Sequence, residues 1–426
     1  KGTIYYTLDG SEPTVNSLKY TGPITIKDAS ANPNTNSMLT TTSGGFLEDK
    51  INRLGNNSNT YPYFIPGYKA PDTLIDKCTV VKAIAIDGDV ASNVVCGSYF
   101  VGFDNEDGYD NAGVISLIAE PEDFFGYEKG IYVMGKTYDT VDSSTQWYAP
   151  YWWWWWSNYS NSGDAWERPV NLSFFNSDKE LILQKDCGAR IRGNGSRGYV
   201  EKSLNFYARS EYDGQDFFDY KFFDNDYIAQ RLTLASGGDD YTTKLYDYLM
   251  SATGQDADYC IAKMQRYTLF INGEYWGNYY LSEKMDEEYF NYYYGVDKDN
   301  LVLIKDGSVE EGNASDIGLY NDMVNYISSN DMTVEANYSK ALDMLDIDSY
   351  IDYYASMAYI GRKGDWPGGN TSLWRSREKG ASPYEDCKWR YVMFDINSGA
   401  YEQYDNDWVN YIVTNNRMFR HLYRNE

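Results

Sequence analysis

The chain has 426 residues, of which 42% are hydrophobic and 23% charged, and its formal net charge is −26 at pH 7. The composition is typical of a folded protein, and the length predicts two or three domains. The negative charge disfavours nucleic acid and anionic membranes as general partners, and no apolar run is long enough for a membrane span. The 44 tyrosines and 12 tryptophans suit a secreted protein that handles sugars.

The first hundred residues are predicted to form β-strands joined by tight turns. Asp9-Gly10 and Asp87-Gly88 are strong turn signals between segments rich in β-branched and aromatic residues. The expected strands are TIYYT, GPITI, CTVVKAIAI and SNVVCGSYFV. We therefore expect a small antiparallel sandwich with a polar excursion across residues 28–62. The chain opens in the middle of a strand, so we expect the sequence to be part of a longer one.

This first region resembles a known accessory module. The segments IYYTLDGSEPT, YTGPITI and VKAIAIDGDVASNVV are similar to the chitobiase/β-hexosaminidase C-terminal-like domain, an immunoglobulin-like module of secreted bacterial proteins. The resemblance covers residues 1–102 and implies a spacer or accessory domain without catalytic residues. The acidic stretch that follows, residues 103–113, is expected to be a linker.

The cysteine and histidine content excludes several kinds of catalytic site. The five cysteines form no Cys-x-x-Cys pair, and the single histidine is His421. A zinc site and Ser-His-Asp or Cys-His catalysis are therefore not expected. Cys78 and Cys96 lie in the same expected domain, where a disulfide and two buried thiols are equally good interpretations.

Residues 114–426 are predicted to mix strands and helices. The expected strands are GIYVMG, RPVNLSFF, GARIRG, KSLNFYAR, NTSLWRS and KWRYVMFDI, with a hairpin turn at Asn272-Gly273. Helices are expected at about 240–253, 315–328 and 349–360. Strands come first and helices later, which predicts two lobes, about 114–280 and 281–426, the second of them truncated.

Five consecutive tryptophans, Trp152 to Trp156, lie in a polar context. An exposed aromatic surface of this kind suits stacking on sugar rings or contact with another protein. The alternative is a loop folded back onto its own domain, because exposing the whole run to water is unfavourable. The sequence leaves both interpretations open.

A basic cluster surrounds a glycine turn in the segment GARIRGNGSRGYVEKSLNFYAR. Its five cations are Arg190, Arg192, Arg197, Lys202 and Arg209. Gly193 and Gly195 allow positive φ, so that backbone N–H groups can converge on an anion. Lys202 shares strand parity with apolar residues, so we expect it to point inward and to need an anionic partner. A hairpin turn with a surface lysine is the simpler interpretation of the turn alone, but the whole cluster favours a phosphate site.

Two further motifs follow in the order of the parts of a kinase. In GDWPGGN, Asp365 and Asn370 have the Asp-x-x-x-x-Asn spacing of a kinase catalytic loop. In YVMFDINSG, Asp395 follows a hydrophobic strand, where a metal-binding aspartate is expected. The glycine-rich loop, Val-Ala-Ile-Lys, His-Arg-Asp and Asp-Phe-Gly motifs of ordinary protein kinases are missing. The helix near residue 247 offers Asp239, Asp240 and Asp247 but no clear glutamate to pair with the lysine.

The same motifs resemble the spore-coat CotH kinase family. The similar segments, which run over residues 113–410, are GIYVMG, the glycine-turn segment, LFINGEYWGNYYLSEKMDEEYF, GDWPGGNTSLWR and KWRYVMFDINSGAY. The resemblance implies an atypical, secreted protein kinase that binds ATP with Mg²⁺ or Mn²⁺ and phosphorylates serines. The fold expected for the chain is therefore multidomain: an all-β immunoglobulin-like sandwich, then an α+β two-lobed atypical protein-kinase-like domain.

The resemblance also implies roles for individual residues. Asp365, Asn370 and Lys202 would be catalytic. The nucleotide-binding residues would be Arg192, Gly193, Gly195, Ser196, Arg197, Lys202 and Glu283. The metal ligands would be Asp395, Asn370 and Asn397. Asn397 stands where the family often has aspartate, and a neutral oxygen holds Mg²⁺ less strongly than a carboxylate.

Three functional hypotheses follow, and phosphoryl transfer from ATP to a protein serine or threonine or to a glycan is the first of them. The second is a non-catalytic kinase-fold scaffold or carbohydrate-associated protein of a surface complex such as a cellulosome. Such a protein would contact its partners through flanking modules outside this sequence. The third is glycoside hydrolysis, which ranks last because it gives the basic loop no role. We expect no nucleic-acid partner, and we expect a bacterial protein that is secreted or attached to the cell surface.

Overall fold

The computed structural model describes residues 2–38, 71–103, 109, 111–140, 156–238, 240, 243–362, 366–397 and 407–424. The chain divides into a first unit of residues 1–238 and 265–281, and a second unit of residues 239–264 and 282–426. Asp365, Trp152–Trp155 and most of the polar excursion therefore lie outside the described residues. Within the described part of the chain, no helix has the length and apolar character needed to cross a membrane.

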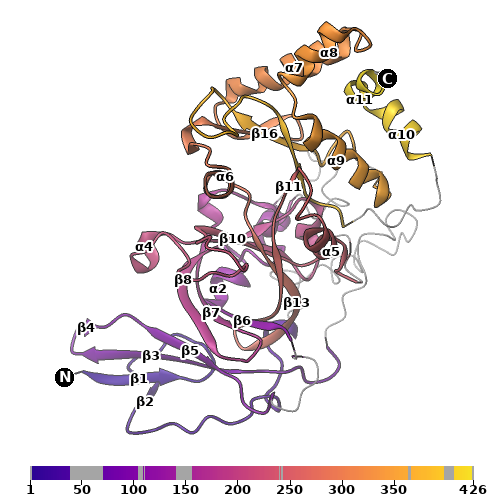
Figure 1. Cartoon of the computed structure of the whole chain (residues 1–426). Coiled ribbons are helices and arrows are strands. Elements are labelled where there is room, and N and C mark those ends of the chain that lie inside the picture. Colours follow the sequence, from indigo (N-terminus) through magenta and orange to yellow (C-terminus); the bar gives the residue numbers. More distant parts are fainter. Residues whose placement is uncertain are drawn as a thin grey trace. The chain divides into compact units, whose positions relative to one another are not determined.

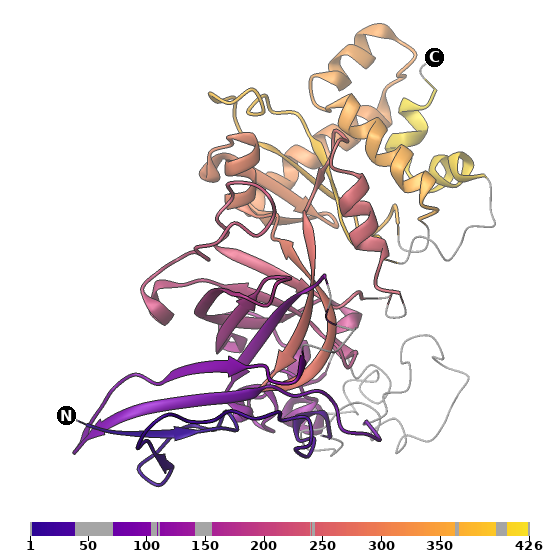
Figure 2. The same ribbon diagram turned by 60° about the horizontal axis from the view of Figure 1, so that its bottom comes forward.

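The first unit begins with an antiparallel sheet in which β3 pairs with β1, β4 and β5 (Figures 1 and 2). Its strands are β1 (Thr3–Thr7), β2 (Leu18–Lys19), β3 (Thr79–Asp87), β4 (Val90–Ala91) and β5 (Val95–Tyr99). The turn expected at Asp87-Gly88 joins β3 to β4, with Gly88 at φ 64°. The strand expected in GPITI is absent, and the described strands of this region form one sheet. The sandwich remains a prediction.

A closed barrel forms the centre of the first unit, in the strand order β10-β13-β12-β6-β7-β8-β9. The strands are β6 (Gly113–Ala119), β7 (Arg168–Phe175), β8 (Leu181–Arg192), β9 (Ser203–Tyr207), β10 (Arg231–Ala235), β12 (Met264–Ile271) and β13 (Glu274–Glu283). Alternate residues such as Leu172 and Phe174 fill the interior, as the two-residue period of a strand requires. β6 is buried on both faces because Val80 and Cys78 of the first region cover its outer side chains.

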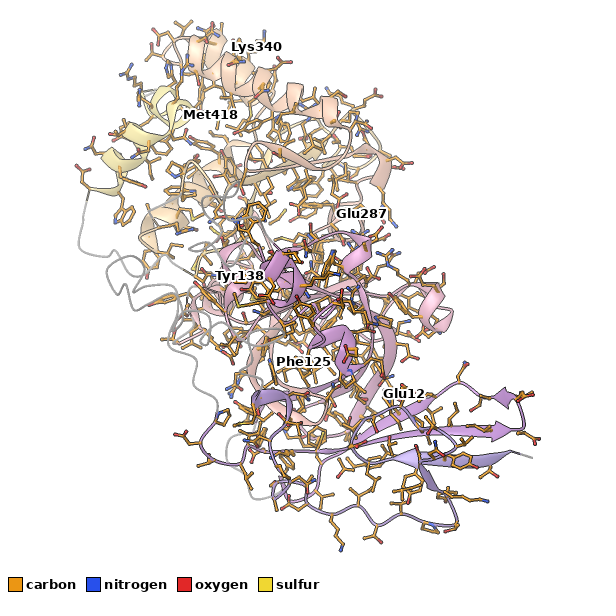
Figure 3. The ribbon with its side chains drawn as sticks, turned by 180° about the vertical axis from the view of Figure 1, so that it is seen from behind. Glu12, Phe125, Tyr138, Glu287, Lys340 and Met418 are labelled. Carbon is orange, nitrogen blue, oxygen red and sulfur yellow. The ribbon has the colours of Figure 1, made fainter. Side chains whose placement is uncertain are left out.

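The hydrophobic run GIYVMG is not the expected strand. It lies as a turn after α2 (Pro121–Phe124), where Tyr132 donates its backbone N–H to Phe124 O at 2.8 Å. Its four central side chains, Ile131 to Met134, are at most 1% exposed and pack into the barrel core. Figure 3 labels Phe125 of the preceding segment, which contacts Tyr132 and Trp276 in this core. Short helices α3 (Gly135–Thr140) and α4 (Ser210–Asp213) complete the unit.

The second unit contains a sheet in the order β11-β17-β16-β14-β15 and most of the helices. The strands are β11 (Cys260–Ile261), β14 (Leu301–Lys305), β15 (Ser308–Glu311), β16 (Ser372–Ser376) and β17 (Arg390–Met393). The helices are α5 (Tyr246–Thr253), α6 (Glu287–Tyr294), α7 (Ile317–Ser329), α8 (Glu335–Leu342), α9 (Ile347–Tyr359), α10 (Trp408–Asn415) and α11 (Arg417–Leu422). Tyr353 of α9 stacks on Tyr391 of β17 with ring centroids 4.4 Å apart, which fixes this helix against the sheet.

The structure also tests the expected helix from residue 240 and the expected state of Cys78 and Cys96. The helix expected from residue 240 begins only at Tyr246, because the Asp240 carboxylate accepts the N–H groups of Thr243 and Leu245 and holds a turn instead. All five cysteines are free, with Cys78 buried and Cys96 half-buried. Both residues are therefore thiols in this structure, but only Cys78 is buried as that interpretation expected.

Candidate functional site

The glycine turn lies between β8 and β9, which pair as the expected antiparallel hairpin. Gly193 has φ 118°, a backbone conformation that residues with a side chain rarely adopt, so a larger residue would be strained there. Gly195 begins the short 3₁₀ turn Gly195–Gly198, and a Cβ atom there would meet open space. We call residues 193–202 the glycine loop.

Two of the five cations beside this loop find their anion within the chain. Arg190 Nε donates to Glu167 Oε2 at 2.8 Å, and Arg209 Nε donates to Glu167 Oε1 at 2.9 Å. Tyr212 donates its hydroxyl to the same carboxylate at 2.9 Å. Burial opposes ionisation of Glu167, but the hydrogen bonds from Arg209 and Arg190 outweigh it, so the pKa of Glu167 is lowered. Part of the basic cluster is thus explained by an internal ion network.

Two more cations bind backbone carbonyl groups. Arg197 donates from Nε to Gly193 O at 2.6 Å and from Nη1 to Tyr159 O at 3.1 Å. Lys202 points inward as expected and is 2% exposed. Its Nζ donates to Arg197 O and Tyr199 O, each at 2.6 Å, and lies 4.0 Å from the ring centroid of Tyr159. Within the described residues, Lys202 has these partners and no carboxylate.

Arg192 is the remaining cation of the cluster. It is the last residue of β8, is half-buried, and forms no hydrogen bond or ion pair with any residue that the structure describes. The first unit therefore brings together Arg192, Gly193, Gly195, Ser196, Arg197 and Lys202, with Arg192 as the cation whose donors remain available. The phosphate role of these residues stays a prediction.

A cluster of oxygen ligands lies in the second unit, where the chain leaves β17. Asp395 is exposed in a left-handed turn with φ 55°, whereas Asn397 is 7% exposed. Asn397 Nδ2 lies 3.3 Å from both Asp395 Oδ1 and Asp247 Oδ2, and Asp247 Oδ1 accepts the backbone N–H of Ile396 at 3.0 Å. We call Asp247, Asp395 and Asn397 the carboxylate cluster. Asp247 was not among the expected site residues.

The loop that carries Asn370 is anchored in the same unit. Trp366 is fully buried, donates Nε1 to Tyr353 OH at 2.9 Å, and accepts the Tyr411 hydroxyl at its backbone oxygen at 2.7 Å. Asn370 is half-buried in a left-handed conformation, φ 50°, and the following Thr371 N–H donates to Asp306 Oδ1 at 3.0 Å. These contacts fix the described part of the GDWPGGN motif on both sides. Asp365 lies outside the described residues.

Glu283 lies at the end of β13 and is 2% exposed. Its Oε2 accepts the backbone N–H of Lys263 at 2.8 Å, and its Oε1 accepts the Tyr293 hydroxyl at 2.5 Å. Both oxygens of its carboxylate therefore accept hydrogen bonds from residues of the second unit. Its nucleotide-binding role remains a prediction.

The oxygen ligands of the second unit suit a divalent cation that is bound together with phosphates. No group of three or more His, Cys, Asp or Glu side chains suited to a metal occurs in the described ranges. The carboxylate cluster supplies two carboxylates and one amide, and Asp395 has no cationic partner among the described residues. Mg²⁺ is usually bound by one or two carboxylates together with substrate phosphates, so this set fits Mg²⁺ or Mn²⁺ bound with a nucleotide.

Comparisons with known protein families give two matches. The family model described as CotH kinase protein matches residues 189–425, and the one described as Fn3 associated matches residues 1–99. The first match includes the glycine loop, the Asn370 loop and the carboxylate cluster. No curated protein matches the chain.

Proposed function

Because the chain belongs to the CotH kinase protein family, we propose that it binds ATP with a divalent metal ion and transfers a phosphoryl group to a hydroxyl acceptor. The observation that carries the proposal is the carboxylate cluster, in which an exposed Asp395 follows a buried strand and lies beside a second carboxylate. In kinase-type enzymes an aspartate in such a position, together with an asparagine of the catalytic loop, holds the metal that accompanies ATP.

The proposal gives each part of the chain a role. Asp395 and Asn370 would hold Mg²⁺ or Mn²⁺, which when bound neutralises charge on the phosphate oxygens. Asp365 would orient or deprotonate the hydroxyl of a protein serine or threonine or of a glycan. The backbone N–H groups of the glycine loop and the guanidinium of the preceding Arg192 would hold the phosphates. Catalysis then depends on positioning and on charge stabilisation, since the attacking hydroxyl belongs to the acceptor.

The finer architecture and the location of the protein belong to the same proposal. Residues 1–102 would form an immunoglobulin-like sandwich, residues 103–113 a linker, and residues 114–426 a two-lobed atypical kinase domain. We propose that the protein acts outside the cell, at a bacterial surface or in a cellulosome, which its acidic, aromatic-rich composition supports.

A catalytically inactive scaffold is the second candidate, and a specific contact favours it. Asn397 directs its NH₂ group, a donor, at both carboxylates, so its side chain in this arrangement takes the place of a cation instead of supplying a ligand oxygen. Binding a metal through the Asn397 oxygen requires the amide to rotate. An inactive protein of this fold would bind carbohydrate or a protein partner and would hold no nucleotide.

Transfer from γ-labelled ATP to casein or to the chain itself, with Mn²⁺ or Mg²⁺, tests the proposal. We expect Asp365→Ala to abolish transfer while ATP affinity changes less than threefold. Asp322→Ala, which changes an exposed aspartate of α7, is the matched control and should leave transfer unchanged. Equal transfer by the wild type and Asp365→Ala would refute the catalytic assignment. ATP binding without transfer in the wild type would favour the scaffold.

A further inference from the structure

All the hydrogen-bonding capacity of the Lys202 side chain is directed into the protein. An ammonium group has three donors. Two are taken by Arg197 O and Tyr199 O, and the rings of Tyr159 and Tyr132 lie 4.0 Å and 5.4 Å from Nζ. Carbonyl oxygens and aromatic faces both attract a cation, so the group is satisfied without a carboxylate. It is also sealed from water, at 2% exposure.

The two carbonyl groups that Lys202 binds belong to the backbone of the glycine loop. Arg197 lies in the 3₁₀ turn Gly195–Gly198 and Tyr199 caps its end, so the ammonium binds carbonyl groups that the turn leaves unpaired. The backbone N–H of Lys202 donates to Tyr132 OH at 3.0 Å, and the same hydroxyl accepts Trp276 Nε1 at 2.8 Å. The residue therefore ties the end of the loop to the barrel core through both its main chain and its side chain.

The two arginines near Lys202 differ in whether their hydrogen-bond donors are already used within the protein. Arg197 turns back onto Gly193 O and Tyr159 O, so it also stabilises the loop from within. Arg192 directly precedes the loop, at the end opposite Lys202, and has no hydrogen-bond or ion-pair partner in the part of the chain that is described. Its guanidinium presents five donors in a planar fork that matches a phosphate group. The open space at Gly195 leaves room for an anion to approach the backbone.

On the basis of the proposed function, we infer that Lys202 is a positioning residue that holds the glycine loop in shape, and that Arg192, directly before this loop, is the cation that contacts the phosphates of the nucleotide. Burial, and second the charge of Arg197, lower the pKa of Lys202 well below its ordinary value, which agrees with a group that meets no anion. A phosphate contact by Lys202 would require it to leave both carbonyl groups and the aromatic pocket. Arg192 needs no such rearrangement.

Reductive methylation of the folded wild-type chain tests the role of Lys202 without any substitution. Lys221, whose side chain is 59% exposed, is the internal reference in the same unit. We expect Lys202 to be modified at least tenfold more slowly than Lys221 whether or not ATP is present. Modification of Lys202 at the rate of Lys221 without ATP, and protection by ATP, would show a phosphate contact and overturn the inference.

Hydrogen exchange of Lys202→Met adds a second measurement. We expect the amides of residues 193–201 to exchange at least tenfold faster in this variant than in the wild type without nucleotide. Lys185→Met is the matched control, because Lys185 is also a buried lysine of the barrel but binds Asp213 at 2.7 Å, away from the loop. Unchanged exchange in residues 193–201 of a folded Lys202→Met variant would contradict the positioning role.

Arg192→Gln tests the phosphate contact. The variant should keep the wild-type unfolding temperature, because Arg192 has no described hydrogen bond to lose, while its dissociation constants for ATP and for tripolyphosphate rise at least tenfold. Wild-type affinity for both ligands in Arg192→Gln would overturn this part of the inference. If the wild type binds tripolyphosphate but not ATP, the proposed nucleotide function fails and the anion site remains. If it binds neither, the Arg192 contact fails too, whereas the methylation result for Lys202 still stands.

Discussion

The side-chain amide of Asn397 lies 3.3 Å from a carboxylate oxygen of Asp247, a residue 150 positions earlier in the chain. The same amide nitrogen lies 3.3 Å from Asp395 Oδ1. A neutral donor between two carboxylates reduces their repulsion and so stabilises the turn after β17. Asp247 also fixes the backbone of that turn through the Ile396 N–H.

Replacing this amide with a carboxylate should make the turn depend on metal. Asn397→Asp removes the shared donor and adds a third negative charge, which we expect to cost about 1–3 kcal/mol of the free energy of unfolding in EDTA. Mg²⁺ or Mn²⁺ should restore much of this loss and raise the unfolding temperature more than in the wild type. Thermal unfolding with each metal and with EDTA measures the effect, and identical metal responses in the two proteins would contradict it.

Removing Asp247 should loosen the same turn from the other side. Asp247→Ala deletes the acceptor of the Ile396 N–H and leaves the Asn397 amide with one partner fewer, so we expect a loss of about 1–3 kcal/mol in stability. Metal-dependent ATP affinity should also fall at least tenfold. Urea unfolding and calorimetry measure the two effects, with Asp322→Ala as control. A stable variant with full ATP affinity would remove Asp247 from the site.

The ion network of Glu167 should make stability depend on pH. The pKa of Glu167 is lowered, so the stabilisation it provides is fully present above its unfolded-state pKa of about 4.3 and is lost as pH falls through the lower folded-state pKa. Glu167→Gln should therefore destabilise the protein most near neutral pH. Urea unfolding of both proteins from pH 7 to pH 3 should show the difference shrinking, and a difference independent of pH would count against this network.

The first region should depend on Glu274 for its attachment within the first unit. The Glu274 carboxylate accepts the N–H groups of Thr35, Asn36 and Ser37, at the start of the short 3₁₀ turn Asn36–Met38. Glu274→Ala should lower stability by about 2–3 kcal/mol, since hydrogen bonds to a charged group are the stronger kind. Hydrogen exchange at residues 35–38 should rise with it. Glu211→Ala, an exposed carboxylate of α4, is the control, and equal exchange in the two variants would refute the attachment.

Local signals in the sequence predicted the hairpins and the longer helices. Asn272 and Gly273 adopt φ of 48° and 86°, which is why this pair marks the turn between β12 and β13. The same reasoning failed at GIYVMG, since a short apolar run does not distinguish a strand from a buried turn. The start of α5 was missed because Asp240 caps a turn and Lys244 takes φ 57°.

The partners within the site could not be predicted in this way. Sequence placed Asp395 after a strand and five cations near a glycine turn, but the contacts that define their roles are distant in the chain. Glu167 lies 23 residues from Arg190 and 42 from Arg209, and Asp247 lies 149 from Ile396. Local sequence propensities do not predict contacts between residues so far apart in the chain. The closure of the barrel, with β12 parallel to β6, is non-local in the same way.

Calorimetric titration of ATP into the purified chain, with Mg²⁺, with Mn²⁺ and with EDTA, tests the central claim most directly. The proposed function predicts binding that requires the metal, that falls at least tenfold in Asp395→Ala, and that is unchanged in Asp322→Ala. Absence of binding under every condition, in protein shown to be folded, would contradict it and leave the kinase-fold scaffold as the better account.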